Sequence, residues 1–464
     1  MVAGQGWQNM LRRIGRDMAG FARCFRTPEA MPGLYSYRFR PPGGLRQVHL
    51  RIDRDGEAVL LIDASEAIYL NRTAALLARA ALERRPRAEA VAIARRLGAG
   101  RQEAERAAAV VYRMIENLAA SPDCPICAID GPSLLRIEPF SRSVAAPLKA
   151  DLALSYGCNN ACGHCYNEPG RRTMPSLDAA GWRAVLDRLA AIGVPQAIFT
   201  GGEPTLFPGL VELVRHASAL GLICGMNTNG RRLSDLGLAE QLAAAGLNHA
   251  QITLESSRAE VHNAMTGKRS FDETLAGVRN AVAAGLHAIT NTTLTRRNVD
   301  DAEEMVDLAA ELGLAAAAFN GMIYSGRGCL SGEGLSEEEL LPVLVALRDR
   351  AAALGVRMLW YTPTPYCKLS PQALELGPRR CNAGEYSMCI EPNGDVLPCQ
   401  SYYQSAGNLL ADPWESIWHS SLFRGFRERT LRPRESGLPE ECFDCPDLAV
   451  CGGGCRLQRE RGGK

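Results

Sequence analysis

The chain has 464 residues, with 52 lysine and arginine residues against 51 aspartate and glutamate residues, so its formal charge at pH 7 is +1. This length predicts two or three domains, and a charge near zero gives no reason to expect nucleic acid or an anionic membrane as a partner. No apolar run is long enough for a membrane span, and the N-terminus lacks the apolar segment of a secretory signal. The 16 cysteines therefore indicate metal ligands rather than disulfides, and we expect a cytoplasmic protein.

Residues 1–35 form the first predicted segment. Apolar residues recur there at steps of three and four from Trp7 to Phe25, with arginines between them, which predicts a basic amphipathic helix. Such a helix can lie on a membrane or on a partner. The simpler interpretation, which we prefer, is a loosely packed extension or a misplaced translation start.

Residues 36–120 are expected to form a small α+β domain. Two apolar runs flank a turn at residues 54–56 and predict a β-hairpin. In chain order, the predicted strands are 48–52, 58–62 and 67–70, and the predicted helices are 72–84, 87–97 and 101–119.

The order of these elements, with the segment 63–71 before the first helix, resembles PqqD-like domains. Those domains are winged-helix modules that bind the leader of a ribosomally made precursor peptide. They add a peptide strand to the edge of their sheet, which is a recognised mode of peptide capture. The resemblance implies a peptide-recognition domain, and the alternative is a structural cap on the domain that follows.

Residues 121–148 are rich in proline and serine and are expected to form a linker. The linker contains a CxxC pair, Cys124 and Cys127. Such a pair can be a redox couple, half of a zinc site, cluster ligands or plain structural thiols. The sequence leaves these roles open.

In residues 149–356, predicted strands and helices alternate, which calls for a parallel sheet covered by helices. The predicted strands are 150–156, 196–200, 222–227, 249–255, 287–293 and 315–322. The predicted helices are 177–192, 208–220, 235–246, 270–285, 299–312 and 336–354.

Three cysteines, Cys158, Cys162 and Cys165, follow the first of these strands within eight residues. Thiolates are soft ligands that suit iron–sulfur clusters and zinc. A four-iron cluster held by three cysteines keeps one iron open, as catalytic metal sites do. The alternative is a zinc site that His164 or a distant residue completes.

This CxxxCxxC motif, with Tyr166 directly after it, resembles the cluster motif of radical S-adenosylmethionine (SAM) enzymes. The second strand is followed by a segment that resembles the GGEP motif of the same family, made of Gly201, Gly202, Glu203 and Pro204. The resemblance implies a partial (β/α)6 TIM-like barrel. It also implies a 4Fe–4S cluster on the three cysteines, SAM bound to the open iron, and a GGE segment that grips the amino group of SAM.

In barrels of this kind the chemistry lies at the carboxyl ends of the strands. The two glycines allow close backbone approach, and the Glu203 carboxylate can accept charge-assisted hydrogen bonds from an ammonium group. Four further residues at strand ends are candidates for binding the nucleotide: Asn227, Asn229, Glu255 and Ser256. The alternative for residues 227–230 is an ordinary Asn-Gly turn. Many radical SAM relatives carry Asp where Glu255 stands.

Residues 357–464 change character, since seven of the 16 cysteines lie between residues 381 and 455 in loops rich in glycine and proline. Metal binding must supply much of the folding energy there. The spacing resembles the SPASM extension of radical SAM enzymes, an iron–sulfur domain with auxiliary clusters. The resemblance implies one cluster on Cys381, Cys399 and Cys455, and a second on Cys442, Cys445 and Cys451.

The chain departs from that pattern because no cysteine follows Cys455. The second cluster then keeps an open iron, uses a ligand other than cysteine, or borrows from the CxxC of the linker. A smaller cluster or a lost cluster is the competing interpretation, which leaves one or two auxiliary clusters. Cys389 or Cys367 can complete the first cluster, and Cys329 and Cys367 are also candidate hydrogen donors to a substrate radical.

The expected fold is therefore α/β, with a winged-helix-like N-terminal domain and a cysteine-rich C-terminal iron–sulfur domain around the barrel. The resemblance implies a radical SAM maturase that cleaves SAM reductively to a 5′-deoxyadenosyl radical and crosslinks side chains of a precursor peptide, bound by its leader. A flavodoxin- or ferredoxin-type reductant is implied as well. The alternatives are a maturase of protein side chains or of a cofactor, and a non-catalytic iron–sulfur protein that binds peptides. The sequence assigns no catalytic side chain.

Overall fold

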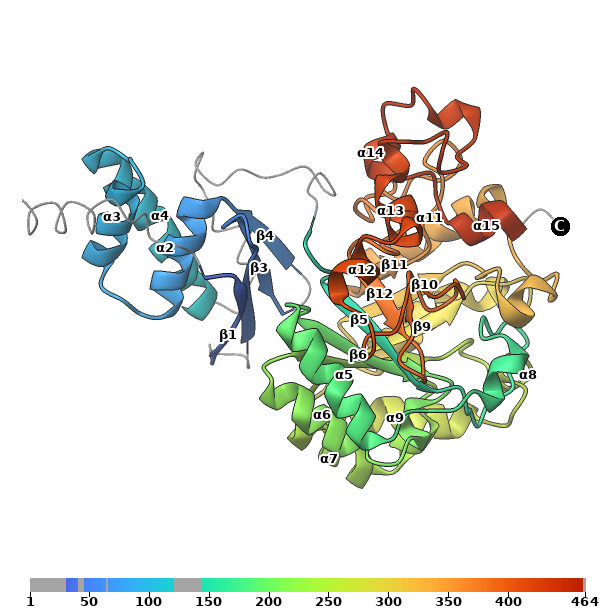
Figure 1. Ribbon diagram of the computed structural model, residues 1–464. Coiled ribbons are helices and arrows are strands. Elements are labelled where there is room, and N and C mark those ends of the chain that lie inside the picture. The colour runs from blue at the N-terminus through green and yellow to red at the C-terminus, as the bar shows by residue number, and fades with distance from the viewer. Residues whose placement is uncertain (1–30, 41–45, 64–65, 121–143, 462–464) are drawn as a thin grey trace, which may run out of the picture. The chain divides into compact units, whose positions relative to one another are not determined.

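The computed structural model describes residues 31–40, 46–63, 66–120 and 144–461 (Figure 1). The chain divides into two compact units, Met1–Ile137 and Glu138–Lys464, which we call unit 1 and unit 2. Most of the predicted N-terminal extension, and both linker cysteines, Cys124 and Cys127, lie outside the described residues.

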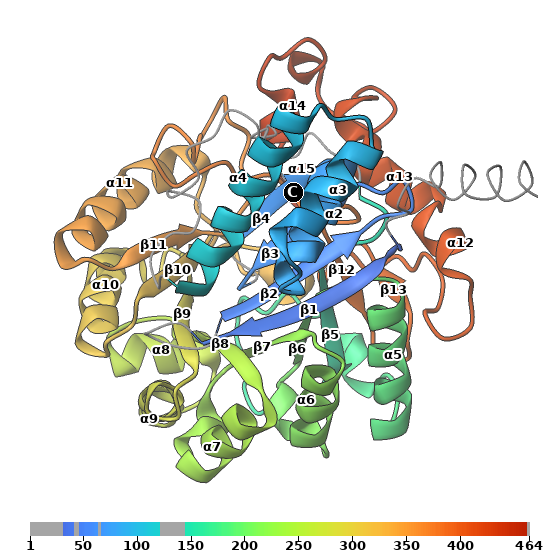
Figure 2. The same cartoon turned by 90° about the vertical axis from the view of Figure 1, so that its left-hand side faces the viewer.

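Unit 1 is an antiparallel sheet with three helices on one face (Figure 2). Its strands follow one another in space as in sequence: β1 (Gly33–Phe39), β2 (Arg46–Ile52), β3 (Ala58–Ile62) and β4 (Glu66–Leu70). The helices are α2 (Arg72–Leu82), α3 (Arg87–Arg96) and α4 (Arg101–Ala120). Alternate residues of β2 and β3 enter the core because side chains of a strand point to opposite faces. Asn71 caps α2 by accepting a hydrogen bond from the Ala74 N–H.

The predicted strands and helices of this unit are found within a few residues, but strand β1 was missed. It pairs along its full length with β2. Tyr35, Tyr37 and Phe39 alternate along β1 and pack against the core, so the period-two signal was present in the sequence. Because β1 begins at Gly33, the expected boundary between residues 35 and 36 falls inside a strand.

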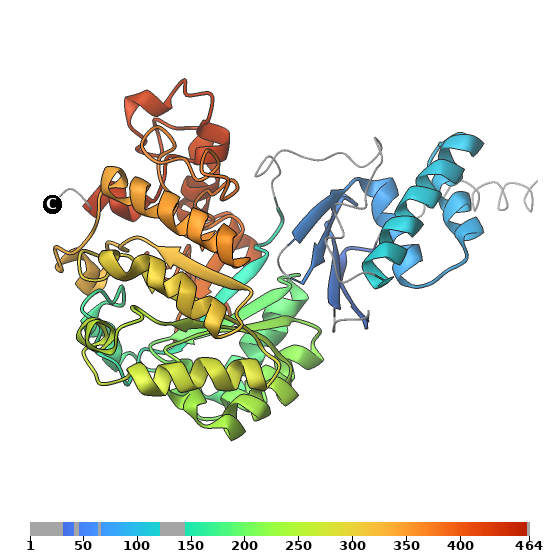
Figure 3. The same ribbon diagram turned by 180° about the vertical axis from the view of Figure 1, so that it is seen from behind.

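Unit 2 is built on a nine-stranded sheet in the order β11-β10-β9-β8-β7-β6-β5-β12-β13. The first six of these strands along the chain run parallel to one another. They are β5 (Lys149–Ser155), β6 (Gln196–Gly201), β7 (Ile223–Thr228), β8 (Leu247–Thr253), β9 (His287–Thr293) and β10 (Ala316–Asn320). The main helices are α5 (Ala179–Ala191), α6 (Leu210–Ala219), α7 (Leu236–Ala245), α9 (Phe271–Ala283), α10 (Ala302–Glu311) and α11 (Glu337–Leu354). They lie outside the strands, as Figure 3 shows for the yellow α10 and the orange α11. This is the α/β architecture that the sequence predicts.

The C-terminal region contributes strands to both sides of this sheet. β11 (Arg357–Trp360) runs parallel to β10, and β12 (Ser387–Ile390) runs parallel to β5 and pairs with β13 (Val396–Leu397). The sheet therefore continues past residue 356, where the sequence predicts that the barrel ends. Pairing with β12 also satisfies the outer edge of β5, the strand that precedes the cysteine motif.

Several short helices, joined by loops, complete unit 2. A helix that was not predicted, α8 (Ala259–Thr266), follows β8. The last ones are α12 (Trp414–Trp418), α13 (Ser421–Arg427), α14 (Leu448–Cys451) and α15 (Arg456–Arg461). In the described ranges, none of the helices has the length and apolar character needed to cross a membrane.

Candidate active site

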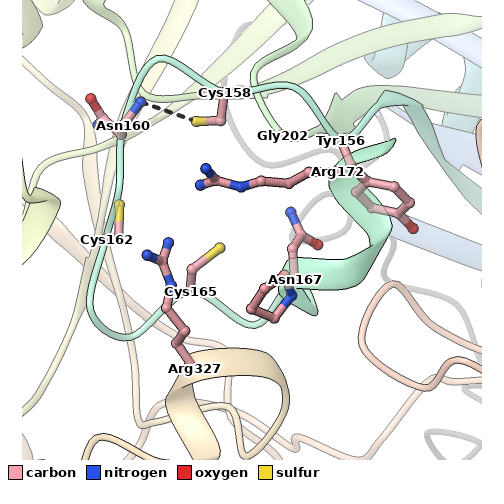
Figure 4. A pocket seen from close by; sticks show the side chains of 10 residues that line it. Tyr156, Cys158, Asn160, Cys162, Cys165, Asn167, Arg172, Gly202 and Arg327 are labelled. Atoms are coloured by element: carbon pink, nitrogen blue, oxygen red, sulfur yellow. Dashed lines mark hydrogen bonds between the residues drawn. The ribbon is translucent and has the colours of Figure 1, made fainter. Parts of the chain in front are cut away.

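The cysteine motif lies in the loop that leaves the carboxyl end of β5. The thiols of Cys158, Cys162 and Cys165 face one cavity of about 150 Å³ (Figure 4). Seven further residues line this cavity: Tyr156, Asn160, Asn167, Pro169, Arg172, Gly202 and Arg327. The predicted cluster cysteines and one glycine of the GGEP segment are thus brought together, as parallel strands ending at one edge require.

Backbone contacts with distant segments fix the shape of this loop. The Ala161 and Gly163 N–H groups donate to carbonyls at the end of α8, at 2.9 and 3.0 Å, and the Cys165 carbonyl accepts from the Arg327 N–H at 2.9 Å. The Arg231 guanidinium, which follows β7, donates to the Asn159 carbonyl at 2.7 Å. A loop without regular structure is therefore held by three other parts of the barrel.

Gly201 and Gly202 bring the end of β6 against the cysteine loop. The Gly202 N–H donates to the Ser155 carbonyl at 2.7 Å, and the Glu203 N–H donates to the Gly157 carbonyl at 2.8 Å. A Cβ on Gly202 would lie 2.1 Å from the Gly157 oxygen, and Gly201 has a φ of +125°. Only glycine allows the two backbones to approach so closely.

The Glu203 carboxylate is buried, with 1 % of the residue exposed. It accepts hydrogen bonds from the Thr205 N–H and hydroxyl, from the Thr228 hydroxyl at 2.7 Å and from the Asn229 N–H at 2.8 Å. Burial raises the pKa of Glu203, and these donors act in the opposite direction. Glu203 thus joins the ends of β6 and β7, while its contact with the SAM ammonium stays a prediction. Pro204, also buried, opens the short 3-10 helix Pro204–Leu206.

The other predicted nucleotide contacts lie at different depths. Asn229 donates to the Asn159 side chain at 2.6 Å and lies 3.9 Å from the Cys158 sulfur, so it supports the cysteine loop. Asn227 is half-buried on β7, opposite Gln251 of β8. Ser256 is fully buried and its hydroxyl donates to Asp301 at 3.0 Å. Their contacts with a nucleotide stay predictions.

Glu255 contacts the cysteine loop through His164. The Nε2 atom of His164 lies 2.9 Å from Glu255 Oε1, and Glu255 Oε2 accepts from the Thr293 N–H at 2.9 Å. Burial lowers the pKa of His164, but the charge and hydrogen bond of Glu255 outweigh burial and raise it. From the sequence, His164 was considered only as a zinc ligand. Nothing in the sequence shows that two residues 91 positions apart are in contact.

Two arginines point into the cavity, Arg172 and Arg327 (Figure 4). The sequence offered Arg327 only as a residue that follows the sixth predicted strand, and it did not single out Arg172. Each contributes a positive charge, Arg172 near Cys158 and Arg327 near Cys162 and His164. A guanidinium group can bind a carboxylate through two parallel hydrogen bonds. Arg172 lies only seven residues past Cys165, and this position in the motif loop was the available signal.

The loop suits an iron–sulfur cluster. Burial raises the pKa of the Cys158 and Cys162 thiols, so bound iron would have to displace their protons. In the parts of the chain that the structure describes, no three His, Cys, Asp or Glu side chains are arranged around one metal ion. In a 4Fe–4S cluster each cysteine binds a different iron, so the cysteine sulfurs lie farther apart than they do around a single zinc ion. The three thiols lining one cavity therefore fit the cluster better than zinc.

A second group of thiols gathers near the end of the chain. Cys381, Cys399 and Cys455 pack against one small cluster of buried residues that includes Tyr402 and Phe426. Burial and the neighbouring Cys381 raise the pKa of Cys455 to about 11 and that of Cys399 further. These are the three cysteines that the spacing assigns to the first auxiliary cluster.

Buried charges connect this group to the segment with the remaining cysteines. The Arg429 guanidinium donates to the Cys381 carbonyl at 2.5 Å and to the Gly452 carbonyl at 3.2 Å. Arg380 donates to the Ala449 carbonyl at 2.7 Å and pairs with the buried Glu385. The Cys442–Cys455 stretch is thereby held on the Cys381 segment.

Cys389, a candidate for completing the first cluster, lies on β12. It is fully buried and packs with Ala153, Tyr156 and Leu397. Burial raises its pKa well above that of an ordinary thiol. Its surroundings are those of a small apolar core residue.

Two family models match the chain. The model described as "Radical SAM superfamily" matches residues 152–309, and the model described as "Iron-sulfur cluster-binding domain" (SPASM) matches residues 381–446. The first range holds the cysteine loop and the GGEP segment, and the second holds four of the six cysteines assigned to auxiliary clusters.

Curated relatives match about two thirds of the chain. The chain is 34% identical over 334 residues to the mycofactocin maturase MftC of Mycolicibacterium smegmatis, a match that spans 69% of this chain and 80% of the relative. It is 33% identical over 335 residues to the PqqA peptide cyclase of Xanthomonas campestris pv. campestris, spanning 68% of this chain and 84% of the relative.

Among solved structures, Streptococcus suis SuiB bound to the precursor peptide SuiA matches with a TM-score of 0.62. The match has 17% sequence identity and covers 91% of this chain and 96% of SuiB. Because 91% exceeds the share of the chain in unit 2, the likeness in fold extends into unit 1.

Proposed function

Because this chain belongs to the radical SAM superfamily and carries a SPASM region, we propose that it modifies side chains of a ribosomally made precursor peptide. As a member of that family it is an enzyme that uses a 4Fe–4S cluster, SAM and auxiliary iron–sulfur clusters. The observation that carries the proposal is the cavity in which three thiols, Gly202 and two guanidinium groups converge.

Residues in and beside the cavity have distinct roles in this proposal. Cys158, Cys162 and Cys165 hold the cluster, which, with SAM bound, supplies the chemistry that removes hydrogen from an unreactive carbon. The Gly201–Gly202 backbone, with Glu203 and Pro204, shapes the wall against which the amino acid part of SAM lies. Arg172 or Arg327 pairs with its carboxylate.

The ribose side of the nucleotide is proposed to lie toward the ends of β7 and β8. Asn227, Asn229, Glu255 and Ser256 all belong to these strand ends. Asn227 is the most accessible of them to a ligand because its side chain is half-buried, whereas Glu255 and Ser256 are fully buried. The last two act through the protein segments that they hold.

A peptide substrate is supported by what the relatives are named for. One relative is named a PqqA peptide cyclase, and SuiB was solved bound to its precursor peptide SuiA. In the described residues of unit 1, β1 and β4 each pair with another strand on one side. An edge strand can pair with an extended peptide through backbone hydrogen bonds. We propose that unit 1 is a PqqD-like module that binds the leader in this way, and that the division of the chain into recognition, barrel and SPASM regions follows from these roles.

Two other functions compete with this one. A maturase of protein side chains or of a cofactor would use the same cavity and leave unit 1 with a structural role. A non-catalytic iron–sulfur protein would not need the GGEP segment against the cysteine loop.

We propose a flavodoxin- or ferredoxin-type reductant and a cytoplasmic location, because the chemistry needs low-potential electrons.

The test is an anaerobic reaction of the reconstituted chain with SAM, a reductant and the candidate precursor peptide. We expect a mass change in the peptide together with 5′-deoxyadenosine above background, and neither product from the C158A variant. Failure to form 5′-deoxyadenosine with a fully loaded cluster would overturn the enzyme assignment.

A second reaction tests the substrate class. The same peptide without its leader should be modified much more slowly, and adding the leader as a separate peptide should restore part of the rate. Equal rates with and without the leader would favour the alternatives in which unit 1 is structural.

A further inference from the structure

We infer that Cys367 is the fourth cysteine ligand of the auxiliary cluster held by Cys442, Cys445 and Cys451. It would replace the cysteine that the SPASM pattern expects after Cys455. The inference rests on the proposed function, since it takes the SPASM region to hold auxiliary clusters. The assignment also moves Cys367 from the first cluster, where the sequence considered it, to the second.

The segment before Cys367 lies directly against Cys451. The Tyr366 N–H donates to the Cys451 sulfur at 3.3 Å, and the same sulfur lies 3.9 Å from the Thr364 carbonyl. Cys451 itself is buried, with 7 % of the residue exposed. Because Cys367 follows Tyr366 directly, its backbone is fixed beside one of the three assigned ligands. A backbone N–H that donates to a ligand sulfur is also one of the contacts that tune iron–sulfur clusters.

A tight turn keeps Cys367 in this position. The Pro365 carbonyl accepts from the Lys368 and Leu369 N–H groups, both at 2.9 Å, and the Thr364 hydroxyl donates to the Leu369 carbonyl at 2.7 Å. On the other side, Gly454 packs so closely on Pro365 that an added Cβ would lie 2.8 Å from its ring. The turn at residues 364–369 is thus held between the two ends of the CxxxC pair formed by Cys451 and Cys455.

The three assigned ligands lie in one compact stretch of the chain. The Cys445 N–H donates to the Cys442 carbonyl at 3.5 Å, and the Leu448 N–H donates to the Cys445 carbonyl at 3.2 Å. The Cys451 N–H donates to the Asp447 carbonyl at 2.8 Å. The turn before Cys367 therefore contacts a folded segment that carries all three ligands.

The chemistry of the neighbourhood favours the thiol over other ligands. Asp444 and Asp447 lie in the same loop, but carboxylates are hard ligands, whereas thiolates are the ligands that hold iron–sulfur clusters. Cys389 is enclosed in the core beside Tyr156. Cys367 is exposed, so iron can reach its sulfur.

The first experiment follows the reactivity of Cys367 in the full-length chain. The chain is treated briefly with iodoacetamide under anaerobic conditions, once with clusters loaded and once after chelation of the iron, and labelled peptides are identified by mass. We expect Cys367 to be labelled almost completely without iron and almost not at all in the loaded chain, in parallel with Cys442. Equal labelling of Cys367 in both states would overturn the inference, as would protection of Cys124 and Cys127 in its place.

The second experiment counts iron in a chain whose three barrel cysteines are replaced by alanine, which leaves only the auxiliary clusters, with roughly eight irons for two 4Fe–4S clusters. Adding C367A should lower the iron content or convert one cluster to a 3Fe–4S form with its own electron paramagnetic resonance signal. The matched control C224A, at a buried thiol of β7 that belongs to neither set, should leave iron and spectra unchanged. Unchanged spectra in C367A would contradict the assignment. If instead the parent chain binds no iron, the proposed function itself fails.

Discussion

His164 and Glu255 form a contact of 2.9 Å between the cysteine loop and the end of β8, although 91 residues separate them in the sequence. Glu255 is fully buried and its second oxygen is held by the Thr293 N–H. The pair therefore anchors the middle of the CxxC half of the cluster motif to the barrel. Partners that orient the groups around a metal typically change affinity or activity by about 10- to 100-fold when removed.

We expect E255A and H164A each to lower the rate of 5′-deoxyadenosine formation per loaded cluster by roughly 10- to 100-fold. The double variant should be no worse than the poorer single variant, because both remove one contact. The control is E260A, since Glu260 is exposed on the neighbouring helix α8. Fully additive losses in the double variant would show that the two residues act separately.

Glu203 is expected to be essential for the alignment of β6 and β7. In E203Q the amide nitrogen would face donors at Thr205, Thr228 or the Asn229 N–H, leaving at least one of them without an acceptor. An unsatisfied buried group costs about 1–3 kcal/mol, so the urea midpoint of the cluster-free E203Q chain should fall. In the chain with its cluster loaded, the same variant should bind SAM more weakly. E212Q, at an exposed position of α6, is the matched control. A variant as stable as the parent would contradict this role.

The close approach at Gly202 gives a steric prediction. In G202A the new methyl group would meet the Gly157 carbonyl, so the cysteine loop must move. We expect a loss of about 1–3 kcal/mol in stability and incomplete iron loading at Cys158, Cys162 and Cys165, measured as iron per folded chain. G170A is the comparison, because a Cβ there meets no atom within 4 Å. Equal iron loading in both variants would be the contrary result.

The buried His262 makes stability depend on pH. Its Nδ1 atom accepts the Glu255 N–H at 3.2 Å, and its Nε2 lies 3.1 Å from the Ser270 hydroxyl, so the neutral ring fits both contacts. Burial lowers its pKa to about 4, whereas an unfolded histidine titrates near 6.5. Between these values the unfolded chain binds more protons than the folded chain, so stability falls as the pH decreases from about 6.5 to about 4.

The loss attributable to His262 is at most about 3 kcal/mol, at about 1.4 kcal/mol per pKa unit. It is measured by urea unfolding of the cluster-free chain at several pH values. H262Q should flatten part of this slope, while H419Q, at an exposed histidine, should leave it unchanged. Some slope will remain in H262Q, because burial and His287 also lower the pKa of His249 to about 4. A slope identical to that of the parent would refute the role of His262.

The positions of most elements could be predicted from the sequence because local patterns decide them. The strand at His287–Thr293 has the predicted bounds, and the three helices of unit 1 begin where predicted. Apolar periodicity reports which face of an element is buried. The cysteine motif could be identified from the sequence as well, since its three thiols lie within eight consecutive residues and belong to one loop.

What the sequence alone determined is thus the local part of this protein: its elements, its cluster motif and the glycines beside it. Only the tertiary structure decided which distant segments meet, namely β12 beside β5, His164 against Glu255, and the turn before Cys367 against Cys451. The physical reason is that a residue's chemistry and periodicity say what kind of partner it needs, while the path of the whole chain selects the partner.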